Sequence, residues 1–425
     1  MPPEPDAGRV GTSTQPHLAY MDGLRAVAVI AVVLYHAICS AAWAGPSMSA
    51  PMSPNPVWWL ATFASKGSHG VDLFFVISGF CLAYPILASI RNAGSARFDL
   101  TGFFAKRMVR ILPPFYIAFA LCTLWMFVST HTGFMQAEPG LDFSPLALLR
   151  QLLFLDRGAT FTNGSFWTLP VEFRWYLAFP LVLVLYVRSQ RAFWSLLAAC
   201  IVAFNLTSLR AIDIATLPAF MLGIVAADWQ IVGHRLRSYA PMLFLIALDL
   251  AFILEPYSSV PSRFGLADNV GFFLQTNVGW QLVSFFLVVS AGSLPALRRA
   301  FEWRPLCAVG VAAYAIYLTH QPLEFAWGLH GGMYVGPFVH LGVDLALSLG
   351  VGFGFWYVAE RPFVERRTRA RLVAALAGPI GRALTFAGLP QRFELAANPA
   401  APAVRRDEAV PEPLPDTVAA YSSLA

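Results

Sequence analysis

Long apolar runs separated by short polar or charged segments recur along the whole chain. A helix that crosses a bilayer needs about 20 mostly apolar residues, and most of these runs come near that length. They are continuous and do not alternate as the strands of a β-barrel would. The pattern therefore predicts an all-α, polytopic membrane protein with about ten transmembrane helices. The predicted spans are residues 26–42, 71–90, 111–130, 175–187, 193–209, 214–229, 240–254, 272–294, 306–329 and 339–358.

The two ends of the chain lack this pattern. Residues 1–19 are polar and Pro-rich, without the apolar core of a cleavable signal peptide, so we expect a cytoplasmic N-terminal tail. Residues 20–363 hold the predicted membrane domain. Residues 364–425 are predicted to be a cytoplasmic C-terminal tail. We expect disorder from about residue 396, where Ala and Pro are frequent and charge is scattered.

The distribution of Arg and Lys predicts the orientation. Cytoplasmic loops of membrane proteins carry an excess of these residues. If the N-terminus is cytoplasmic, 14 of them fall on the inner side even without the C-terminal tail. Five fall on the outer side, namely Lys66, Arg150, Arg157, Arg210 and Arg263. We therefore predict an N-in, C-in topology.

Composition narrows the class of protein further. Hydrophobic residues make up 57% of the chain and charged residues 12%, about half the charged share of a soluble domain. This balance excludes a disordered protein, a soluble enzyme and a nucleic-acid-binding domain. The five cysteines lie in apolar runs without metal-ligand spacing, so we expect inert thiols and no bound metal. We expect a multi-pass protein of the inner (plasma) membrane of a bacterium. Of the 29 basic residues 27 are Arg, which indicates a GC-rich genome.

Ionisable residues inside spans are costly and mark candidate functional sites. In the first span, Arg25 and His36 are eleven residues apart, which places them on one helix face about 16 Å apart along the axis. Arg suits a phosphate, and a neutral imidazole is a natural base near pH 7. An Arg at the lipid headgroups and a His hydrogen-bonded between helices explain the pattern equally well.

Two further segments carry candidate chemistry. Arg107 and Arg110 are i,i+3 neighbours at the cytoplasmic edge of the third span, where two guanidinium groups suit a diphosphate or 3′-phosphate; ordinary positive-inside flanking charge is the alternative. Glu172 enters the membrane at the predicted outer face, where it serves as a second acid or base or orients His36. An ion pair with Arg174 is its structural alternative.

A possible substrate cavity involves four other positions. Asp72 is a carboxylate in the second span, and Trp167 lies in the aromatic segment before Glu172. The same second span carries Ser78 and Gly79, which favour close helix packing. Tyr317 and His320 share a face of the ninth span, and Pro322 just after them is expected to distort the helix.

Six segments together resemble the acyltransferase-3 family of integral membrane acyltransferases. The departures from the family pattern are Ala26 for the usual Gly and Pro170 for the usual Ser, and neither removes an ionisable group. The segments occur in the right order, at residues 21–28 with 35–37, 70–80, 107–110, 167–173, 314–320 and 360–362.

The resemblance implies ten core spans, a cytoplasmic acyl-CoA donor and acyl transfer to a hydroxyl on a glycan or lipid-linked sugar. It implies that Arg25 and His36 form the functional pair and that Arg107 and Arg110 contact the donor. Glu172 becomes a further site residue. Acyl-CoA is then a co-substrate, and no bound cofactor is expected.

The hypothesis from the sequence is a membrane O-acyltransferase, with an acetyl group expected. It moves the acyl group from cytoplasmic acyl-CoA to a hydroxyl of a saccharide, a lipid-linked sugar or a glycosylated small molecule. The lipid bilayer is a further expected partner, and binding to nucleic acid is not expected. His36 either acts as general base or carries the acyl group transiently. The alternative from another class is a transporter for a glycan or other anionic substrate, which also uses intramembrane charge.

Overall fold

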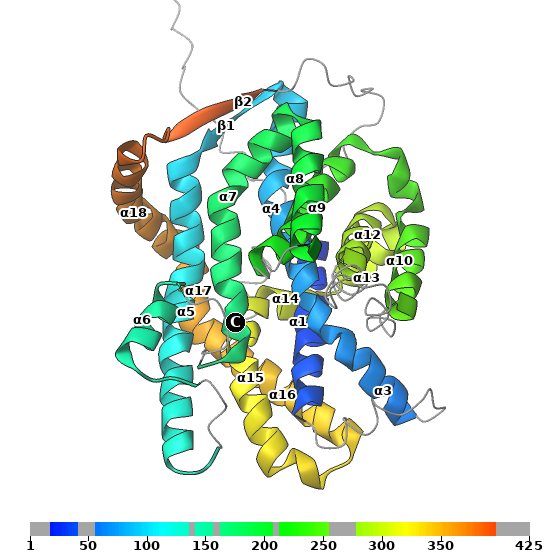
Figure 1. Cartoon of the computed structure of the whole chain (residues 1–425), viewed down its shortest axis with the longest axis vertical. Coiled ribbons are helices and arrows are strands. Elements are labelled where there is room, and N and C mark those ends of the chain that lie inside the picture. Colours follow the sequence, from blue (N-terminus) through cyan, green and yellow to red (C-terminus); the bar gives the residue numbers. More distant parts are fainter. Residues whose placement is uncertain are drawn as a thin grey trace, which may run out of the picture.

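The computed structural model describes residues 18–40, 56–135, 141–155, 162–206, 212–254 and 278–396. Within these ranges the chain is a helix bundle with one small antiparallel sheet (Figure 1). The helices are α1 (Ala19–Cys39), α3 (Pro56–Ser65), α4 (Gly70–Ala93), α5 (Leu100–His131), α6 (Pro145–Leu152), α7 (Thr168–Arg188), α8 (Gln190–Leu206), α9 (Ile212–Val232), α10 (Ala240–Leu254), α12 (Gly279–Ser293), α13 (Pro295–Phe301), α14 (Arg304–Val311), α15 (Ala313–His330), α16 (Pro337–Phe355), α17 (Arg361–Val364) and α18 (Arg366–Phe386). The shorter elements are η1 (Lys66–His69), η2 (Gly164–Trp167), η3 (Arg235–Tyr239), η7 (Gly332–Tyr334), η8 (Trp356–Glu360) and the paired strands β1 (Ser95–Asp99) and β2 (Arg392–Ala396).

Each of the ten predicted apolar runs falls on a helix or a bent helix pair, apart from run ends at 41–42, 207–209 and 272–277, which lie outside the described residues. Six helical segments of the described part are long and apolar enough to cross a bilayer. Two bent pairs, α12 with α13 at 103° and α14 with α15 at 72°, raise this number to eight if each pair crosses once. The all-α, polytopic architecture is therefore confirmed, while the count of ten spans and the N-in, C-in orientation stay predictions.

Small residues let α4 and α9 approach each other closely. A Cβ added at Gly79 would lie 2.1 Å from the carbonyl oxygen of Phe220. A Cβ added at Gly223 would lie 2.1 Å from the carbonyl oxygen of Val76. The packing interpretation of Gly79 is confirmed, since only glycine permits backbones to touch in this way.

Large apolar side chains remain exposed on the helices at the rim of the bundle. A soluble protein would bury most of them, whereas a bilayer covers them with hydrocarbon. Examples are Leu121, Leu124 and Phe127 on α5, Leu245 and Leu250 on α10, and Leu347 and Val351 on α16.

Helix α1 runs through the middle of the bundle and packs against α4, α14, α15 and α16. At its first turns, a Cβ added at Gly23 would lie 2.0 Å from the carbonyl oxygen of Phe301. Near its other end, Nε2 of His340 lies 3.0 Å from the carbonyl oxygen of Ala37 and donates to it. The start of α1 thus lies beside α13 and α14, and its end lies beside the connection between α15 and α16.

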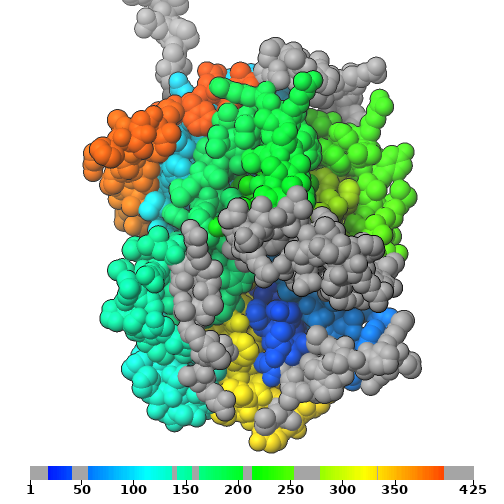
Figure 2. Space-filling view, in the orientation of Figure 1, coloured from blue at the N-terminus to red at the C-terminus, as the bar shows by residue number. Residues whose placement is uncertain are grey.

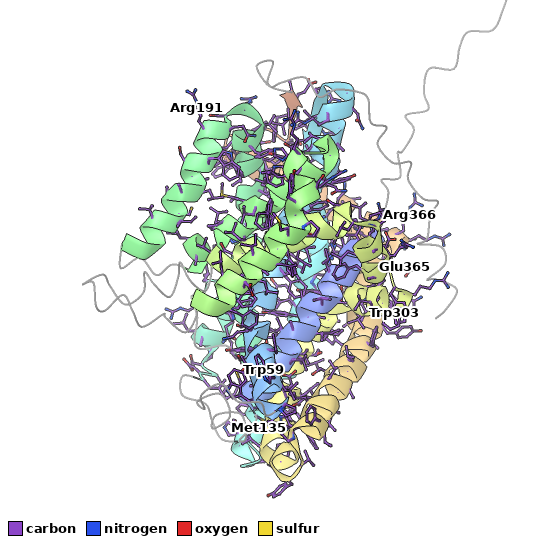
Figure 3. All side chains as sticks on the ribbon, turned by 90° about the vertical axis from the view of Figure 1, so that its right-hand side faces the viewer. Trp59, Met135, Arg191, Trp303, Glu365 and Arg366 are labelled. Carbon is purple, nitrogen blue, oxygen red and sulfur yellow. The ribbon has the colours of Figure 1, made fainter. Side chains whose placement is uncertain are left out.

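The residues predicted on opposite sides of the membrane separate in space. Trp303, Glu365 and Arg366 lie on one flank of the molecule in Figure 3, while Trp59 and Met135 lie toward its lower end. The first three belong to segments predicted to be cytoplasmic and the last two to segments predicted to be external. Arg191, also in a segment predicted to be cytoplasmic, lies at the upper left of the same view, and the topology stays a prediction.

The first part of the predicted C-terminal tail is folded. Helix α18 packs against α5, and β2 pairs with β1 from Ser95 opposite Ala396 to Asp99 opposite Arg392. Asp99, the last residue of β1, also caps α5, because its side chain accepts a hydrogen bond from the backbone amide of Gly102. The tail expected to be disordered from about residue 396 lies outside the described residues.

Candidate active site

A cavity of about 270 Å³ lies between α1, α4, α5, α7, α14 and α15. It brings together five of the residues that the sequence singled out, because its lining includes Arg25, Arg107, Arg110, Glu172 and Tyr317. These residues come from four helices that are far apart in the sequence. The cavity is therefore the first candidate for a substrate site.

Arg25 is held in the cavity wall by its own helix. One of its guanidinium nitrogens donates to the carboxylate of Asp22, one turn earlier. The other lies 3.2 Å from Sγ of Cys81 on α4. Cys81 itself lines the cavity. The sequence led us to expect only apolar surroundings for this thiol, but it also meets the guanidinium of Arg25.

Arg107 and Arg110 bring positive charge that no ion pair within the described residues neutralises. The Arg107 guanidinium lies 5.9 Å from the ring centre of Phe103 and 5.8 Å from that of Tyr176. Its Nε is buried without a hydrogen-bond partner, and in the described ranges neither arginine forms an ion pair. A buried cation of this kind is costly unless an anion joins it, so the site is suited to an anionic ligand.

Glu172 lines the same cavity as the arginines. Its carboxylate accepts a hydrogen bond from Tyr176, whose hydroxyl also lies 3.2 Å from Oγ of Ser78. The alternative ion pair with Arg174 is wrong, because Arg174 Nε donates to Asp213 at 2.8 Å. No hydrogen bond joins Glu172 to His36 among the described residues.

The position of Glu172 follows from the segment that precedes it. Pro322 lacks the amide hydrogen that would bond to the carbonyl of Leu318, four residues earlier. The side-chain amide of Asn163 donates to that carbonyl instead, at 2.9 Å. Helix α15 therefore continues to His330, and η2 enters the bundle with its Phe166 fully buried. The distortion expected at Pro322 stays a prediction, and a bend of 72° lies between α14 and α15.

Two histidines lie together beyond the cavity. The ring centres of His36 and His320 are 5.2 Å apart, and His320 is completely buried. Nδ1 of His320 donates to the carbonyl of Tyr317 at 2.9 Å, which leaves its Nε2 as an acceptor 3.3 Å from Oγ of Ser165. Nε2 of Gln321 lies 3.4 Å from Nδ1 of His36, too long a contact to fix the tautomer of that ring.

Tyr317 connects the histidine pair with the cavity. It lines the cavity, and its ring lies 5.6 Å from that of His320. Its hydroxyl donates to the carbonyl of Ser165 at 3.0 Å and accepts from Thr168 at 2.9 Å. A row of polar side chains therefore leads from the arginines, past Tyr317, to the two imidazoles.

The structure does not bring Asp72 and Trp167 to this cavity. The Asp72 carboxylate lies 3.0 Å from Nδ1 of His69 and 3.5 Å from Nε2 of Gln281. Trp167 packs against the largest apolar cluster of the bundle. Both side chains belong to the packing around the site.

Sequence reasoning missed several polar residues that surround the histidines. Ser165, for example, donates through its backbone amide to the side chain of Gln321 at 2.6 Å. Gln321 follows His320 directly but belongs to none of the motifs. The available signal was the presence of buried polar side chains in otherwise apolar segments, which need hydrogen-bond partners.

Three curated bacterial proteins are similar to this chain in sequence. YrhL of Bacillus subtilis (strain 168) is 27% identical over 337 residues, which cover 71% of this chain and 48% of the relative. The O-acetyltransferase OatA of Staphylococcus aureus (strain NCTC 8325 / PS 47) is 23% identical over 340 residues, 72% of this chain and 50% of its own. The peptidoglycan O-acetyltransferase OatA of Listeria monocytogenes is 22% identical over 328 residues, 71% and 49% of the two chains.

The chain thus spans about half the length of the curated relatives that it matches. No solved structure matches it. The family model for the acyltransferase-3 group, described as an acyltransferase domain, matches residues 18–357. Those residues include the cavity and the histidine pair, and the chain is a multi-pass membrane protein that belongs to the acyltransferase-3 family.

Proposed function

We propose that this chain is a membrane O-acyltransferase. It transfers an acyl group, with acetyl as the simplest case, from cytoplasmic acyl-CoA to a hydroxyl of a saccharide or sugar-bearing acceptor. The observation that carries the proposal is the row of side chains from the three cavity arginines, past Tyr317, to His36 and His320. The printed names of the S. aureus and L. monocytogenes relatives support O-acetyl transfer, and the latter name supports peptidoglycan as the saccharide.

The arginines serve the donor. CoA carries a diphosphate and a ribose phosphate, and guanidinium groups bind phosphate oxygens through paired hydrogen bonds. Arg107 has a buried Nε with no partner among the described residues, and donor binding would supply the missing anion. The pantetheine arm then extends along α1 toward His36, about 16 Å beyond Arg25.

The histidine pair serves the transfer step. The acceptor oxygen attacks the thioester carbonyl carbon, so that a C–O bond forms and the C–S bond breaks. A neutral His36 takes the hydroxyl proton and passes it to the departing sulfur, and the products are the ester and the CoA thiol. His320, whose Nδ1 is anchored on the Tyr317 carbonyl, supports the first ring as its buried neighbour.

The test uses the purified full chain in lipid nanodiscs with radiolabelled acetyl-CoA and peptidoglycan fragments. We expect labelled fragments whose mass rises by one acetyl group and whose label is released by mild base, as an ester requires. A protein that only transports its substrate yields no labelled fragment and contradicts the proposal. Label that stays on His36 when the acceptor is left out would assign the acyl-histidine route in place of the general-base route.

A further inference from the structure

A second hollow lies beside the cavity that the three arginines line, and the proposed function assigns it no role. It is a groove of about 620 Å³ between the first two turns of α5, helix α18 and the start of β2. Figure 2 shows α18 and β2, in orange, against the cyan start of α5 at one corner of the molecule. The groove is firmly built, because the backbone amide of Leu100 donates to the carbonyl of Gln391 at 3.0 Å and β1 pairs with β2.

The rim of the groove is strongly basic. Lys106, Arg366, Arg369 and Arg392 line it, with Asp99 as the acidic residue among its lining side chains. Asp99 lies 3.8 Å from Nε of Arg392 and so offsets part of that charge. The other three cations form no ion pair within the described part of the chain. Three unpaired cations around one groove favour a ligand with more than one negative charge.

The floor of the same groove is apolar. Val373, Ala374 and Ala377 of α18 form this floor, and their small side chains leave room for a flat ring. The hydroxyl of Thr101 borders the groove and is buried, without a hydrogen-bond partner in the described ranges. A flat apolar surface beside a cationic rim matches a nucleoside that carries phosphates, more closely than it matches a bare inorganic anion.

The groove and the cavity lie next to each other along α5. Lys106 lines the groove and Arg110 lines the cavity, and the two are one helical turn apart on the same face. Burial, and after it the nearby charge of Arg110, lowers the pKa of Arg369. The cations of the two hollows are therefore close enough to act on one extended anion.

We propose that this groove binds the adenosine-phosphate end of the acyl-CoA donor. The adenine lies on the floor of α18, and Lys106, Arg366 and Arg369 bind the ribose phosphate. The diphosphate continues to Arg110, and the pantetheine arm enters the cavity. This inference rests on the proposed function, and it makes the folded part of the C-terminal segment a component of the donor site.

The test compares two donors on the purified full chain in nanodiscs of neutral lipid. Acetyl-CoA carries the nucleotide, and S-acetylpantetheine ends before it. In Arg366→Gln/Arg369→Gln we expect KM for acetyl-CoA to rise at least about tenfold, since each charge-assisted hydrogen bond contributes that much or more. KM for S-acetylpantetheine should stay at the wild-type value. Arg371→Gln is the matched control, because Arg371 is exposed on the same helix and does not line the groove.

A second readout needs no enzyme activity. Adenosine 3′,5′-bisphosphate should bind the wild-type chain in calorimetry, and the double variant should lose this binding while the Arg371→Gln control keeps it. If the wild-type chain binds this nucleotide but transfers no acyl group from either donor, the proposed function is contradicted and the groove assignment is not. Equal KM values for acetyl-CoA in wild type and double variant would overturn the groove assignment. If the chain does not bind the nucleotide but binds anionic-lipid vesicles in a charge-dependent way, the groove assignment is overturned and a lipid headgroup is its ligand.

Discussion

Arg107 is expected to matter for donor binding and not for folding. Its guanidinium lies against Phe103 and Tyr176; in the described ranges its buried Nε has no partner and no carboxylate is paired with it. Replacing a buried charge by an apolar side chain of similar length is often neutral or stabilising by about 1–4 kcal/mol. The lost contacts with the two rings cost about 0.5–2 kcal/mol. Arg107→Met should therefore unfold at or above the wild-type temperature.

Donor binding should respond in the opposite direction. Loss of the phosphate contact costs about 1.5–3 kcal/mol, which corresponds to a rise of KM for acetyl-CoA of roughly 10- to 150-fold. The assay pairs thermal unfolding of the purified protein, followed by tryptophan fluorescence, with initial rates over a range of acetyl-CoA concentrations. For Arg107→Met we expect an unfolding temperature at or above that of the wild type together with a raised KM for acetyl-CoA.

Arg91 provides the matched control. It makes hydrogen bonds of 2.9 and 3.1 Å to both carboxylate oxygens of Asp228, which also accepts from Tyr186. Arg91→Met leaves that mostly buried carboxylate without its cation, and because Arg91 is partly exposed we expect a loss of about 2 kcal/mol with little change in KM. An Arg107→Met protein that melts as early as Arg91→Met, with an unchanged KM, would refute the reasoning.

Three further outcomes are expected. His36→Gln should lower the rate of acyl transfer about 10²–10⁴-fold while calorimetry shows unchanged acetyl-CoA binding; a rate near wild type would transfer the base role to His320. Tyr317→Phe should lower the free energy of unfolding by about 1 kcal/mol, because the hydrogen bond from Tyr317 to the Ser165 carbonyl is lost and that carbonyl keeps only its bond of 3.3 Å from Thr168; thermal unfolding in detergent would show this loss. Gly79→Ala should sharply reduce the folded yield in size-exclusion chromatography, whereas Gly350→Ala, whose added Cβ meets nothing within 4 Å, should not.

The sequence predicts the helices well because hydropathy acts locally. Each apolar run falls on a helix, since a backbone surrounded by hydrocarbon has to satisfy its hydrogen bonds within the segment. The bend between α14 and α15 was not predictable in this way. It follows a close approach in which a Cβ added at Gly310 would lie 1.8 Å from the carbonyl oxygen of Asp22. Hydropathy records how apolar a segment is and not which backbone it meets.

The spacing of charged residues predicts part of the site. Arg25 and His36 lie on one helix, and Arg107 with Arg110 lies on another, so the periodicity of each helix places these residues relative to one another. That both pairs lead to a common cavity depends on how α1 and α5 pack against α15. This relation between helices is not encoded in either spacing, and only the structure supplies it.

The position of Glu172 shows where local reasoning ends and what replaces it. Counting spans places this residue at the outer face, because the segment before it is polar and connects two apolar runs. Pro322 frees the carbonyl of Leu318, Asn163 occupies it, and the connecting segment is thereby drawn into the bundle, where Glu172 reaches the arginine cavity. A carboxylate in an anion site repels phosphates. In the proposed donor arrangement we therefore expect Glu172 to face the uncharged pantetheine arm, between the arginines and Tyr317, where it would orient the thioester on its way to His36.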